Sequence, residues 1–491
     1  MAERNYLAFD LGAESGRAVL GRLAGGKLTL EEKHRFPNPN GRINGHLHWN
    51  LLGQWEELKT GLRKTVAGTN IELHGIGVDT WGVDFGLVAK NGEILGNPFH
   101  YRDTRTEGLM ERTFQRVPKE QIFQATGVQF MEINSLFQLI AMRLGSSPLL
   151  DSADTLLFVP DLFNFLFTGI RKSEFSIAST SQMYDPRQKN WATEMLKALD
   201  LPVRIFPEII PSGTILGPLR DDVAAECGAG PIPVIAPATH DTASAVAAVP
   251  TDSSSNDWCY ISSGTWSLMG VEIPQPLIND KALKYNYTNE GGVGGTIRFL
   301  KNIAGLWPVQ ECRRFWKREG HDHTYGELTH MAARARPLVS LLNLAAKPFL
   351  APGEMPIKIE QFCRETNQPL PSARGEYIRA CLDSLALTYR QTLEGLEDVL
   401  GRKIAVIHIV GGGCQNELLN QMTADACKRP VIAGPIEATG IGNILVQAMA
   451  TGDVKSLADA RAIVRASFDV KRYEPRDAGK WDEAYGRFKG L

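Results

Sequence analysis

The stretch YLAFDLGAESGRAVL, residues 6–20, sets the theme of the chain. Residues 6–10, 17–22 and 27–36 either run apolar or alternate, and two short turns that contain glycine separate them. Segments of this kind, bounded by glycine-containing turns, are typical of strands that follow one another directly. The chain is therefore expected to open with a three-stranded antiparallel meander.

A second unit of the same kind is predicted at residues 74–96. Residues 74–79 have the pattern of a strand, Trp81 and Gly82 that of a turn, and residues 83–88 that of the return strand, followed by a hairpin turn at Lys90-Asn-Gly. This pattern predicts another antiparallel pair.

In the middle of the chain, the strand patterns give way to helical patterns. Helical spacing of apolar residues dominates residues 105–200, with loops expected near Pro160 and Pro186. The proline-rich stretch 202–237 is expected to cross from one lobe of the protein to the other.

The second half repeats the opening theme and then alternates. A strand pattern at 258–263, a tight turn at Gly264 and Thr265, and a return strand at 266–271 match the first hairpin. An alternating α/β layer is expected after them, with a helix over 376–400 that stops at Gly401, a strand at 404–410, a glycine turn at 411–413, a helix at 416–428, a strand at 431–433 and a helix at 442–449.

Length and charge limit the architecture and the partners. A chain of 491 residues is too long for one compact core, so two or three domains are expected. The 53 basic and 55 acidic residues give a net charge of -2, with no long run of either sign. Neither nucleic acid nor a membrane surface is favoured as a partner, and a small-molecule ligand is expected. No pattern in the sequence indicates an oligomeric state.

The protein is expected in the cytoplasm. Its N-terminal apolar stretch is too short for a signal peptide, and no segment approaches 18 consecutive apolar residues. The seven cysteines form neither an even framework nor a Cys-x-x-Cys metal clip. They are expected to be mostly reduced thiols, with Cys363 and Cys381 the favoured pair if a disulfide forms.

His240 and Asp241 carry the strongest chemical signal. They come just after the apolar run Ile232–Ala236, which predicts a strand that ends close to them. A carboxylate placed there suits the removal of a proton from a substrate hydroxyl that attacks the terminal phosphate of a nucleotide. The alternative is structural, because Asp and Thr commonly cap helices.

Three turns are candidates for binding phosphate or nucleotide. Asp10–Arg17 joins two strands through small residues whose N–H groups phosphate oxygens can approach, and Asp10 could hold a metal ion through water. Ser263–Thr265 offers hydroxyl and backbone donors from the other half. Gly411–Gly413, between a strand and a helix, would allow a base or ribose to lie against the backbone. An ordinary tight turn is the alternative in each case.

Taken together, these motifs resemble a known family. The stretches that carry the resemblance are Asp10-Leu-Gly, Asp79-Thr-Trp-Gly-Val-Asp, His240-Asp-Thr-Ala-Ser-Ala-Val, Ser263-Gly-Thr-Trp and Gly411-Gly-Gly-Cys-Gln-Asn. Their combination is similar to the carbohydrate kinases named after their FGGY signature, within the actin, hexokinase and Hsp70 superfamily. The resemblance extends from Asp10 to about Gly442.

The resemblance implies a fold and an activity. The expected fold is α/β, with two ribonuclease-H-like domains of the actin-like ATPase type facing each other across a central cleft. Residues 1–244 would form a sugar-binding lobe and residues 245–491 a nucleotide-binding lobe, with ATP and Mg²⁺ as cofactors. The stretches 101–105, 288–292 and 300–307 resemble the members that act on L-rhamnulose, which implies phosphorylation of this ketose at O1.

The resemblance also implies roles for individual residues. Asp241 would be the proton acceptor. The residues expected at the ATP phosphates are Ala13, Glu14, Ser15, Gly16 and Arg17. Those expected beside the rest of the nucleotide are Thr265, Gln310 and, under the adenosine, Gly412. Those expected around the ketose are Gly82, His240, Thr242 and Asn302. Glu14 departs from the family pattern, which has a small hydroxyl residue there, and is expected to point outward.

Other functions remain open at this level. The acceptor could be L-fuculose, D-xylulose or glycerol, because small changes around Gly82 and Asn302 would alter which hydroxyls are paired. The same nucleotide clamp occurs in actin-like filament proteins and chaperone-type ATPases. A sugar-sensing module without catalysis would have no need of Asp241.

Overall fold

The computed structural model describes residues 3–68, 71–252 and 257–491. Its chain forms two compact units, each built on a β-sheet with helices, as the α/β class predicts. The first unit comprises Met1–Asp252, Glu272–Phe299 and Ala438–Ser467, and the second comprises Ser253–Val271, Leu300–Glu437 and Phe468–Leu491. The chain therefore returns twice to the first unit after leaving it, whereas a division at residues 244 and 245 would cross only once.

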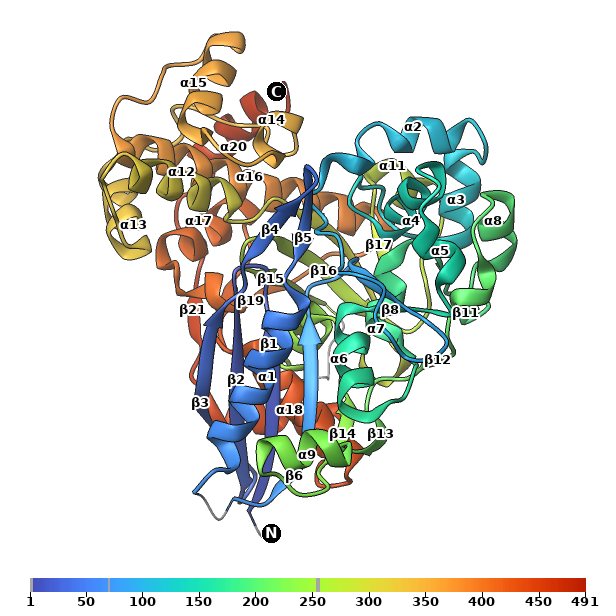
Figure 1. Cartoon of the computed structure of the whole chain (residues 1–491). Helices are drawn as coiled ribbons and strands as arrows, with labels where there is room; N and C mark the ends of the chain where they lie inside the picture. The colour runs from blue at the N-terminus through green and yellow to red at the C-terminus, as the bar shows by residue number, and fades with distance from the viewer. Residues whose placement is uncertain (1–2, 69–70, 253–256) are drawn as a thin grey trace. The chain divides into compact units, whose positions relative to one another are not determined.

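A six-stranded sheet forms the centre of the first unit (Figure 1). Its strands lie in the order β13-β14-β6-β1-β2-β3. They are β1 (Arg4–Leu11), β2 (Ser15–Ala24), β3 (Lys27–Pro37), β6 (Leu73–Thr80), β13 (Thr214–Pro218) and β14 (Pro233–Ala236). Strands β1, β2 and β3 pair antiparallel in sequence order, which confirms the predicted opening meander.

The predicted pairing of residues 74–79 with 83–88 is wrong, whereas the hairpin turn predicted at residues 90–92 is confirmed by an antiparallel bridge between Val88 and Ile94. Strand β6 pairs parallel to β1, and β7 (Phe85–Val88) leaves this sheet to pair antiparallel with β8 (Thr155–Phe158). The side chain of Asp84 explains the turn, because its buried carboxylate accepts hydrogen bonds from the indoles of Trp49 and Trp81 at 2.6 and 3.0 Å. These bonds redirect the chain directly after β6. A glycine-containing turn does not reveal such a buried anchor.

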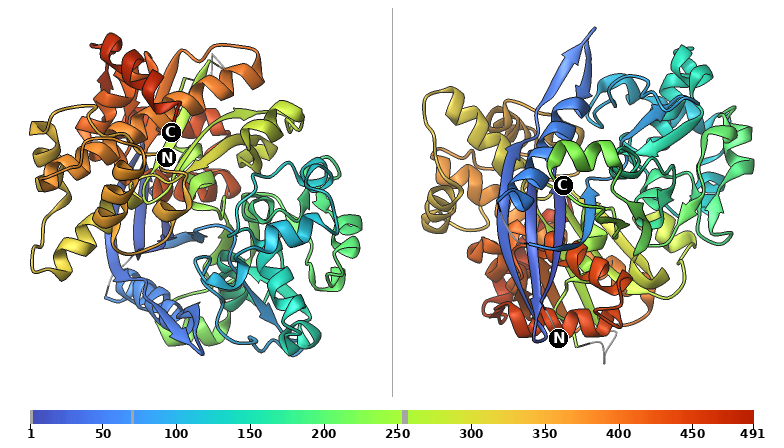
Figure 2. Two further views of the ribbon diagram at one scale, coloured as in Figure 1. Left: turned by 90° about the horizontal axis from the view of Figure 1, so that it is seen from above. Right: turned by 60° about the horizontal axis from the view of Figure 1, so that its bottom comes forward.

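Helices cover both faces of this sheet (Figures 1 and 2). On one face lies α18 (Ala438–Ala450), close enough that a Cβ at Gly77 would come within 2.5 Å of Oδ1 of Asn443. On the other face lie α1 (Leu51–Val66) and α6 (Val159–Thr168), where Phe167 stacks on Phe9 of β1. Helix α18 follows the second unit in the chain, so its packing explains why the first unit is discontinuous.

The remaining elements of the first unit are short. The helices are α2 (Leu109–Phe114), α3 (Lys119–Thr126), α4 (Ser135–Leu144), α5 (Pro148–Ser152), α7 (Phe175–Ala178), α8 (Thr193–Ala198), α9 (Asp221–Cys227), α10 (Asp241–Ala247), α11 (Asp280–Tyr285) and α19 (Leu457–Ser467). The strands are β4 (Asn40–Ile43), β5 (His46–Trp49), β9 (Ser173–Glu174), β10 (Tyr184–Asp185), β11 (Asn190–Trp191), β12 (Ile209–Ile210) and β17 (Thr288–Gly291), with β18 (Ile297–Ile303) beginning here.

Two predictions about prolines need correction. Pro160 lies in the first turn of α6 rather than in a loop, a position where its missing N–H removes no helical hydrogen bond. Residues 202–237 do not cross between units, because they contain α9 and two strands of the first sheet. The loop predicted near Pro186 is confirmed, since it joins β10 to β11.

The second unit repeats the pairing pattern of the first. Its strands β15 (Trp258–Ser263) and β16 (Ser267–Ile273) form the predicted antiparallel hairpin, and β19 (Val406–Val410) and β20 (Val431–Ala433) then add parallel to β15. Strand β21 (Lys471–Tyr473) closes this series antiparallel to β20, as β13 does beside β14. The order β16-β15-β19-β20-β21 thus matches β2-β1-β6-β14-β13.

Helices make up the rest of the second unit. They are α12 (Trp307–Arg318), α13 (Tyr325–Arg334), α14 (Lys347–Leu350), α15 (Met355–Glu365), α16 (Arg374–Leu400), α17 (Glu417–Cys427) and α20 (Ala478–Phe488). Helix α16 confirms the long amphipathic helix expected at 376–400, and Gly401 ends it in a left-handed conformation with φ 67°.

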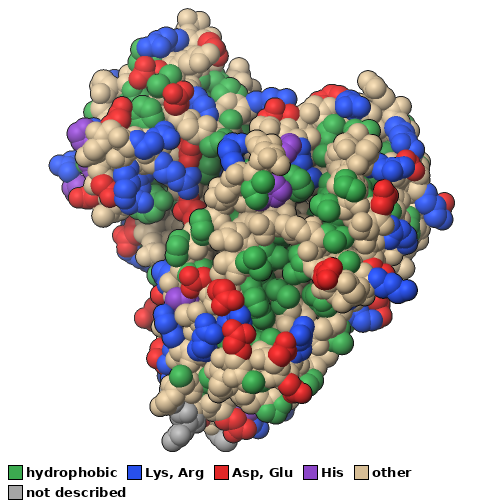
Figure 3. Space-filling model, in the orientation of Figure 1, with side chains coloured by type: hydrophobic (Ala, Val, Ile, Leu, Met, Phe, Trp, Pro, Cys, Tyr) green, Lys and Arg blue, Asp and Glu red, His purple; other side chains and the backbone are tan. Residues whose placement is uncertain are grey.

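The charge distribution on the surface and the state of the cysteines are as the composition predicts. Acidic and basic side chains are interspersed on the face shown in Figure 3, with no broad field of one sign. Throughout the described ranges, no helix has both the length and the apolar character needed to cross a bilayer. All seven cysteines are free and buried, so Cys363 and Cys381 form no disulfide here.

Candidate active site

Three aspartates lie at the carboxyl ends of neighbouring parallel strands in the first unit. Asp10 near the end of β1 is the register partner of Asp79 near the end of β6. Asp241 begins α10 shortly after β14, and a β-bridge joins Thr80 to His240. Carboxyl ends of parallel strands are where α/β folds place their ligand sites. The sheet topology therefore gathers the three carboxylates.

Two of these carboxyl groups, Asp79 and Asp241, have raised pKa values. Burial, and then the nearby charge of Asp10, raise the pKa of Asp79 well above its ordinary value, against a hydrogen bond from Asn443 that lowers it. The same two causes raise the pKa of Asp241 to about 7, against hydrogen bonds from Thr242 and the charge of Arg298. A carboxylate with a pKa near neutrality is suited to accept a proton at physiological pH.

The two oxygens of Asp241 have different surroundings. Oδ1 accepts hydrogen bonds from the backbone N–H of Thr242 and, at 3.1 Å, from its hydroxyl. Oδ2 makes no hydrogen bond to any residue that the structure describes. The side chain is 32% exposed, so a small ligand can reach it. The N-cap of α10 is His240 and not Asp241, which argues against a merely structural role for this carboxylate.

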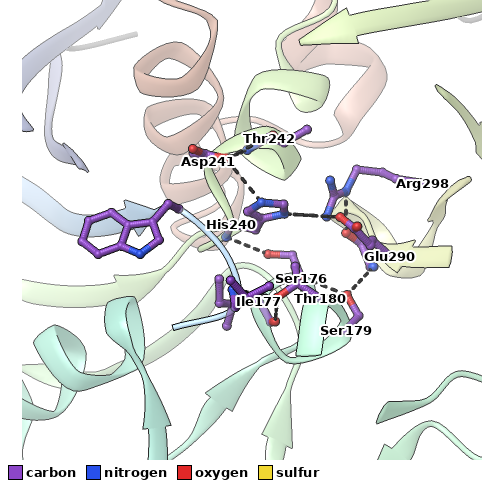
Figure 4. Close-up of polar contacts among 12 residues, drawn as sticks. Ser176, Ile177, Ser179, Thr180, His240, Asp241, Thr242, Glu290 and Arg298 are labelled. Atoms are coloured by element: carbon purple, nitrogen blue, oxygen red, sulfur yellow. Dashed lines mark hydrogen bonds and ion pairs between the residues drawn. The ribbon is translucent and has the colours of Figure 1, made fainter. Parts of the chain in front are cut away.

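His240 lies between Asp241 and a buried ion pair (Figure 4). Its Nε2 is 3.4 Å from Oδ1 of Asp241, and its Nδ1 is 3.1 Å from a guanidinium nitrogen of Arg298 and 3.5 Å from Oε2 of Glu290. Burial, and then the charge of Arg298, hold the pKa of His240 well below its ordinary value. The imidazole is therefore neutral.

The segment that contains His240 is anchored by Glu174. This buried carboxylate accepts hydrogen bonds from the backbone N–H and hydroxyl of Thr239, at 3.0 and 2.7 Å, and from the backbone N–H and hydroxyl of Ser176. The hydroxyl of Ser176 in turn accepts a 3.1 Å bond from the backbone N–H of His240. The neighbourhood of Asp241 is thus fixed by a network of hydrogen bonds before any ligand binds.

Gly82 lies directly beside the imidazole. A Cβ at this position would be 3.2 Å from Nε2 of His240 and 3.4 Å from the side chain of Thr180. The structure therefore brings together three of the four residues predicted around the ketose, Gly82, His240 and Thr242. The fourth, Asn302, belongs to the second unit, four positions beyond Arg298 on β18.

The turn predicted to contact phosphates joins β1 to β2. Ala13 and Ser15 are half-buried, Gly16 is buried, and Glu14 is exposed as expected. The turn is held by Asn38, whose side-chain amide donates to the carbonyl of Gly12 at 2.8 Å. Its backbone groups therefore have a fixed orientation.

Asp10 and Arg17 form an ion pair across the β1–β2 hairpin. A guanidinium nitrogen of Arg17 lies 2.5 Å from Oδ2 of Asp10, the register partner of the buried Asp79. In the described ranges, no group of three or more His, Cys, Asp or Glu side chains is arranged to hold a metal ion directly. Contact through water, as predicted for Asp10, needs no such group.

The other predicted nucleotide residues lie in the second unit. The amide of Gln310 donates to the hydroxyl of Thr265 at 3.1 Å, so these two residues are brought together. Gly412 follows β19, the parallel neighbour of β15, at the sheet edge where Thr265 follows β15. Gly412 is exposed, and a Cβ there would meet nothing within 4 Å. The predicted site residues thus form two groups, one in each unit.

Three residues that the sequence prediction missed belong to this site. Asp79 and Glu290 stand in stretches that carry the family resemblance, but the sequence alone assigns neither of them a role, although an aspartate at the end of an apolar strand is a detectable signal. Glu290 and Arg298 contact His240 from β17 and β18, more than 40 residues away in the chain. Only the tertiary fold reveals them.

Comparison with known proteins agrees with this geometry. Residues 5–248 match the model of the N-terminal domain, and residues 259–451 that of the C-terminal domain, of the FGGY family of carbohydrate kinases. The chain is 44% identical over 487 residues to a protein named rhamnulokinase from Bacteroides thetaiotaomicron, covering 99% of both chains. It is 42% identical over 493 residues to another of that name from Pectobacterium atrosepticum, covering 100% of this chain and 97% of the relative.

Solved structures show the same fold at low sequence identity. A ligand-bound xylulose kinase from Lactobacillus acidophilus superposes with a TM-score of 0.82 at 15% identity, covering 99% of this chain and 97% of that one. A glycerol kinase from Plasmodium falciparum gives 0.80 at 14% identity, covering 99% and 97%. The expected α/β fold with two actin-like domains is confirmed. With both family models matched over most of its length, the chain belongs to the FGGY family of carbohydrate kinases.

Proposed function

We propose that this protein transfers the γ-phosphoryl group of ATP to O1 of L-rhamnulose, giving L-rhamnulose 1-phosphate and ADP. The observation that carries the proposal is the unengaged Oδ2 of Asp241, on a carboxylate whose pKa is about 7. The relatives named rhamnulokinase, at 38 to 44% identity, support the choice of ketose.

Asp241 acts as the proton acceptor in this proposal. Its Oδ2 takes the proton of the O1 hydroxyl while O1 forms a bond to the γ-phosphorus, and the bond from that phosphorus to the β,γ-bridging oxygen breaks. ADP leaves with the electron pair of that bond. Gly82 and His240 would position the ketose, and the backbone of the turn at residues 13–17 would hold phosphate oxygens.

The nucleotide side is proposed on the second group of residues. Thr265 and Gln310 would contact the nucleotide, the exposed Gly412 would lie under the adenosine, and Asn302 would reach the ketose. The first unit would thereby be the sugar-binding lobe and the second the nucleotide-binding lobe. Asp10 fits water-mediated contact with Mg²⁺, because its carboxyl group lies near the end of β1, beside Asp79 and next to the turn proposed to hold the phosphates. Bound Mg²⁺ would neutralise charge that develops on the phosphates.

The proposed location is the cytoplasm, where ATP is available. The proposed small-molecule partners are the ketose and ATP. No contact with nucleic acid or with a membrane is required.

A panel of acceptors tests the proposal. ADP formation would be measured with L-rhamnulose, L-fuculose, D-xylulose and glycerol, and the product identified by ³¹P NMR coupling to the C1 protons. The highest kcat/KM is expected for L-rhamnulose, with phosphorus on O1. A higher value for another acceptor would reassign the substrate within the family. ATP turnover that proceeds at its full rate without sugar would contradict a sugar kinase and favour an actin-like or chaperone-type ATPase.

A further inference from the structure

A buried ion pair lies against the imidazole of His240 on the edge opposite Asp241 (Figure 4). It consists of Glu290 on β17 and Arg298 on β18, with 3.2 Å between Oε2 and a guanidinium nitrogen. The Arg298 side chain is fully buried, and its Nε donates a 2.7 Å hydrogen bond to the carbonyl of Gly291. A buried charge held at two points has a fixed direction, so this guanidinium is a rigid neighbour for the imidazole.

The proton positions on His240 follow from what Arg298 can do. A guanidinium has only hydrogen-bond donors, so Nδ1 of His240, 3.1 Å from it, must accept. A neutral imidazole that accepts at Nδ1 carries its single proton on Nε2. Glu290 favours the other tautomer, since it would accept from an Nδ1–H. It lies further from Nδ1, at 3.5 Å, and its charge is balanced by Arg298.

The proton-bearing Nε2 is the ring nitrogen nearer to Asp241. Nε2 lies 3.4 Å from Oδ1 of Asp241 and next to Gly82. Oδ1 already accepts hydrogen bonds from the backbone N–H and the hydroxyl of Thr242, and an Nε2–H of His240 would be a third donor facing it. The other oxygen, Oδ2, is left to accept the substrate proton.

We propose that Arg298 is a positioning residue that locks His240 as the Nε2–H tautomer, so that His240 donates to Oδ1 of Asp241 and reserves Oδ2 as the base. Without the guanidinium, Glu290 would draw the proton to Nδ1. Nε2 would then present a lone pair to the carboxylate of Asp241. Asp241 would lose the Nε2–H donor, and the lone pair would repel its oxygen. The kinetic part of this inference rests on the proposed function, whereas the tautomer does not.

The tautomer can be observed directly. Protein labelled with ¹⁵N-histidine would be examined by two-bond ¹H–¹⁵N correlation NMR, with the His240→Gln variant identifying the signal of His240 among the ten histidines. A neutral Nε2–H form is expected in the unliganded enzyme, and a shift to the Nδ1–H form in Arg298→Met. Glu290→Gln is the matched control, because it removes the negative charge that favours a proton on Nδ1 and leaves Arg298, so the tautomer of His240 should stay Nε2–H. An Nδ1–H form or an imidazolium in the unaltered enzyme would overturn the proposal, even if Arg298→Met failed to fold.

A double-mutant cycle gives the functional readout. Arg298→Met should lower kcat about tenfold and leave the KM for ATP unchanged, because the loss concerns one catalytic hydrogen bond. In the His240→Gln background the amide has no tautomer to lose, so the same substitution should lower kcat further by less than about threefold. Equal losses in both backgrounds would show that Arg298 acts only through packing, against the proposal. If the unaltered enzyme failed to phosphorylate L-rhamnulose, the proposed function would be wrong. The NMR experiment would still test the tautomer of His240, because it does not depend on activity.

Discussion

Asn443 of α18 donates a 2.6 Å hydrogen bond to Oδ2 of Asp79, the fully buried carboxyl that neighbours Asp10 in the sheet. The other oxygen, Oδ1, has no hydrogen-bond partner among the described residues. One donor does not offset the burial of a charge, so burial and the nearby charge of Asp10 raise the pKa of Asp79 well above its ordinary value.

Replacing Asp79 by Asn should therefore stabilise the protein in alkaline solution. Because burial raises the folded-state pKa of Asp79 above its unfolded value, the stability linked to this group is complete in acid and is lost as pH rises towards the folded-state pKa. Asp79→Asn should raise the thermal midpoint by roughly 2 °C or more at about pH 8.5, and by less at about pH 5. Differential scanning fluorimetry across pH measures this. Exposed Asp252 provides the control Asp252→Asn, which should show no pH-dependent gain. A loss of stability at every pH would argue that Asp79 is ionised in the fold.

Asp241→Asn should separate chemistry from binding. The amide keeps the shape of the carboxylate but cannot accept the O1 proton, so kcat should fall at least about a hundredfold, the usual scale for loss of a general base. The KM for ATP should change by less than about threefold, because no nucleotide contact is proposed for this side chain. A coupled ADP assay measures both constants. Turnover close to that of the unaltered enzyme would remove Asp241 from the role of base.

The pH dependence of kcat/KM for the ketose should report on the same carboxylate. Asp241 works in its ionised form and its pKa is raised to about 7 by burial and by Asp10, so kcat/KM should fall tenfold per pH unit below about pH 7 and level off above it. Direct measurement of ADP by chromatography avoids effects of pH on coupling enzymes. A profile that stays flat down to about pH 5 would mean that no group with a raised pKa controls the reaction.

Gly82→Ala should weaken sugar binding selectively. The added methyl group would lie 3.2 Å from Nε2 of His240, which is tighter than ordinary contact and occupies space beside the proposed donor. The KM for L-rhamnulose should rise about tenfold or more, the scale of one misplaced methyl group, with little change in the KM for ATP. The matched control is Gly230→Ala, because Gly230 is exposed and its Cβ would meet nothing within 4 Å. An unchanged KM for the ketose in Gly82→Ala would place the sugar elsewhere.

Two adjacent glycines in the second unit should respond in opposite ways. A Cβ at Gly413 would lie 2.1 Å from Oγ of Ser263, so Gly413→Ala should lower the thermal midpoint of unfolding. A Cβ at Gly412 has open space, so Gly412→Leu should leave the thermal midpoint unchanged and raise the KM for ATP about tenfold. Thermal unfolding and steady-state kinetics on the two variants decide this. If Gly412→Leu left the KM for ATP unaltered, adenosine would not lie against this turn.

The sequence predicted local structure better than strand partners. The hairpins β1–β2 and β15–β16 and the helix α16 were all predictable, because each rests on contacts between residues close in the chain. The pairing of β6 with β1 was not, since it depends on the buried anchor at Asp84 and on α18, nearly 360 residues further along. Periodicity carries no information about such distant neighbours.

The candidate site shows the same limit. Asp241 could be proposed from its place after an apolar run, and Gly82 and His240 from the family resemblance. The ion pair that contacts His240 could not, because Glu290 stands in a stretch that resembles the family but has no assigned role, Arg298 stands in no such stretch, and the sequence around neither distinguishes a buried charge from a solvated one. The fold supplies that distinction.

The discontinuity of the first unit has a consequence for protein synthesis. Helix α18, which covers one face of the first sheet, is among the last tenth or so of the chain to leave the ribosome. Until then nothing packs against Gly75 and Gly77, which α18 contacts through Asn443 and Gln447 in the folded protein. Asp79 also lacks its hydrogen bond from Asn443. Domains that are continuous in sequence can fold while translation proceeds. In this protein the first strands to be synthesised lack the helix that covers them until nearly the whole chain has been translated. An N-terminal fragment that ends before Ala438 would therefore express poorly and would be expected to bind chaperones.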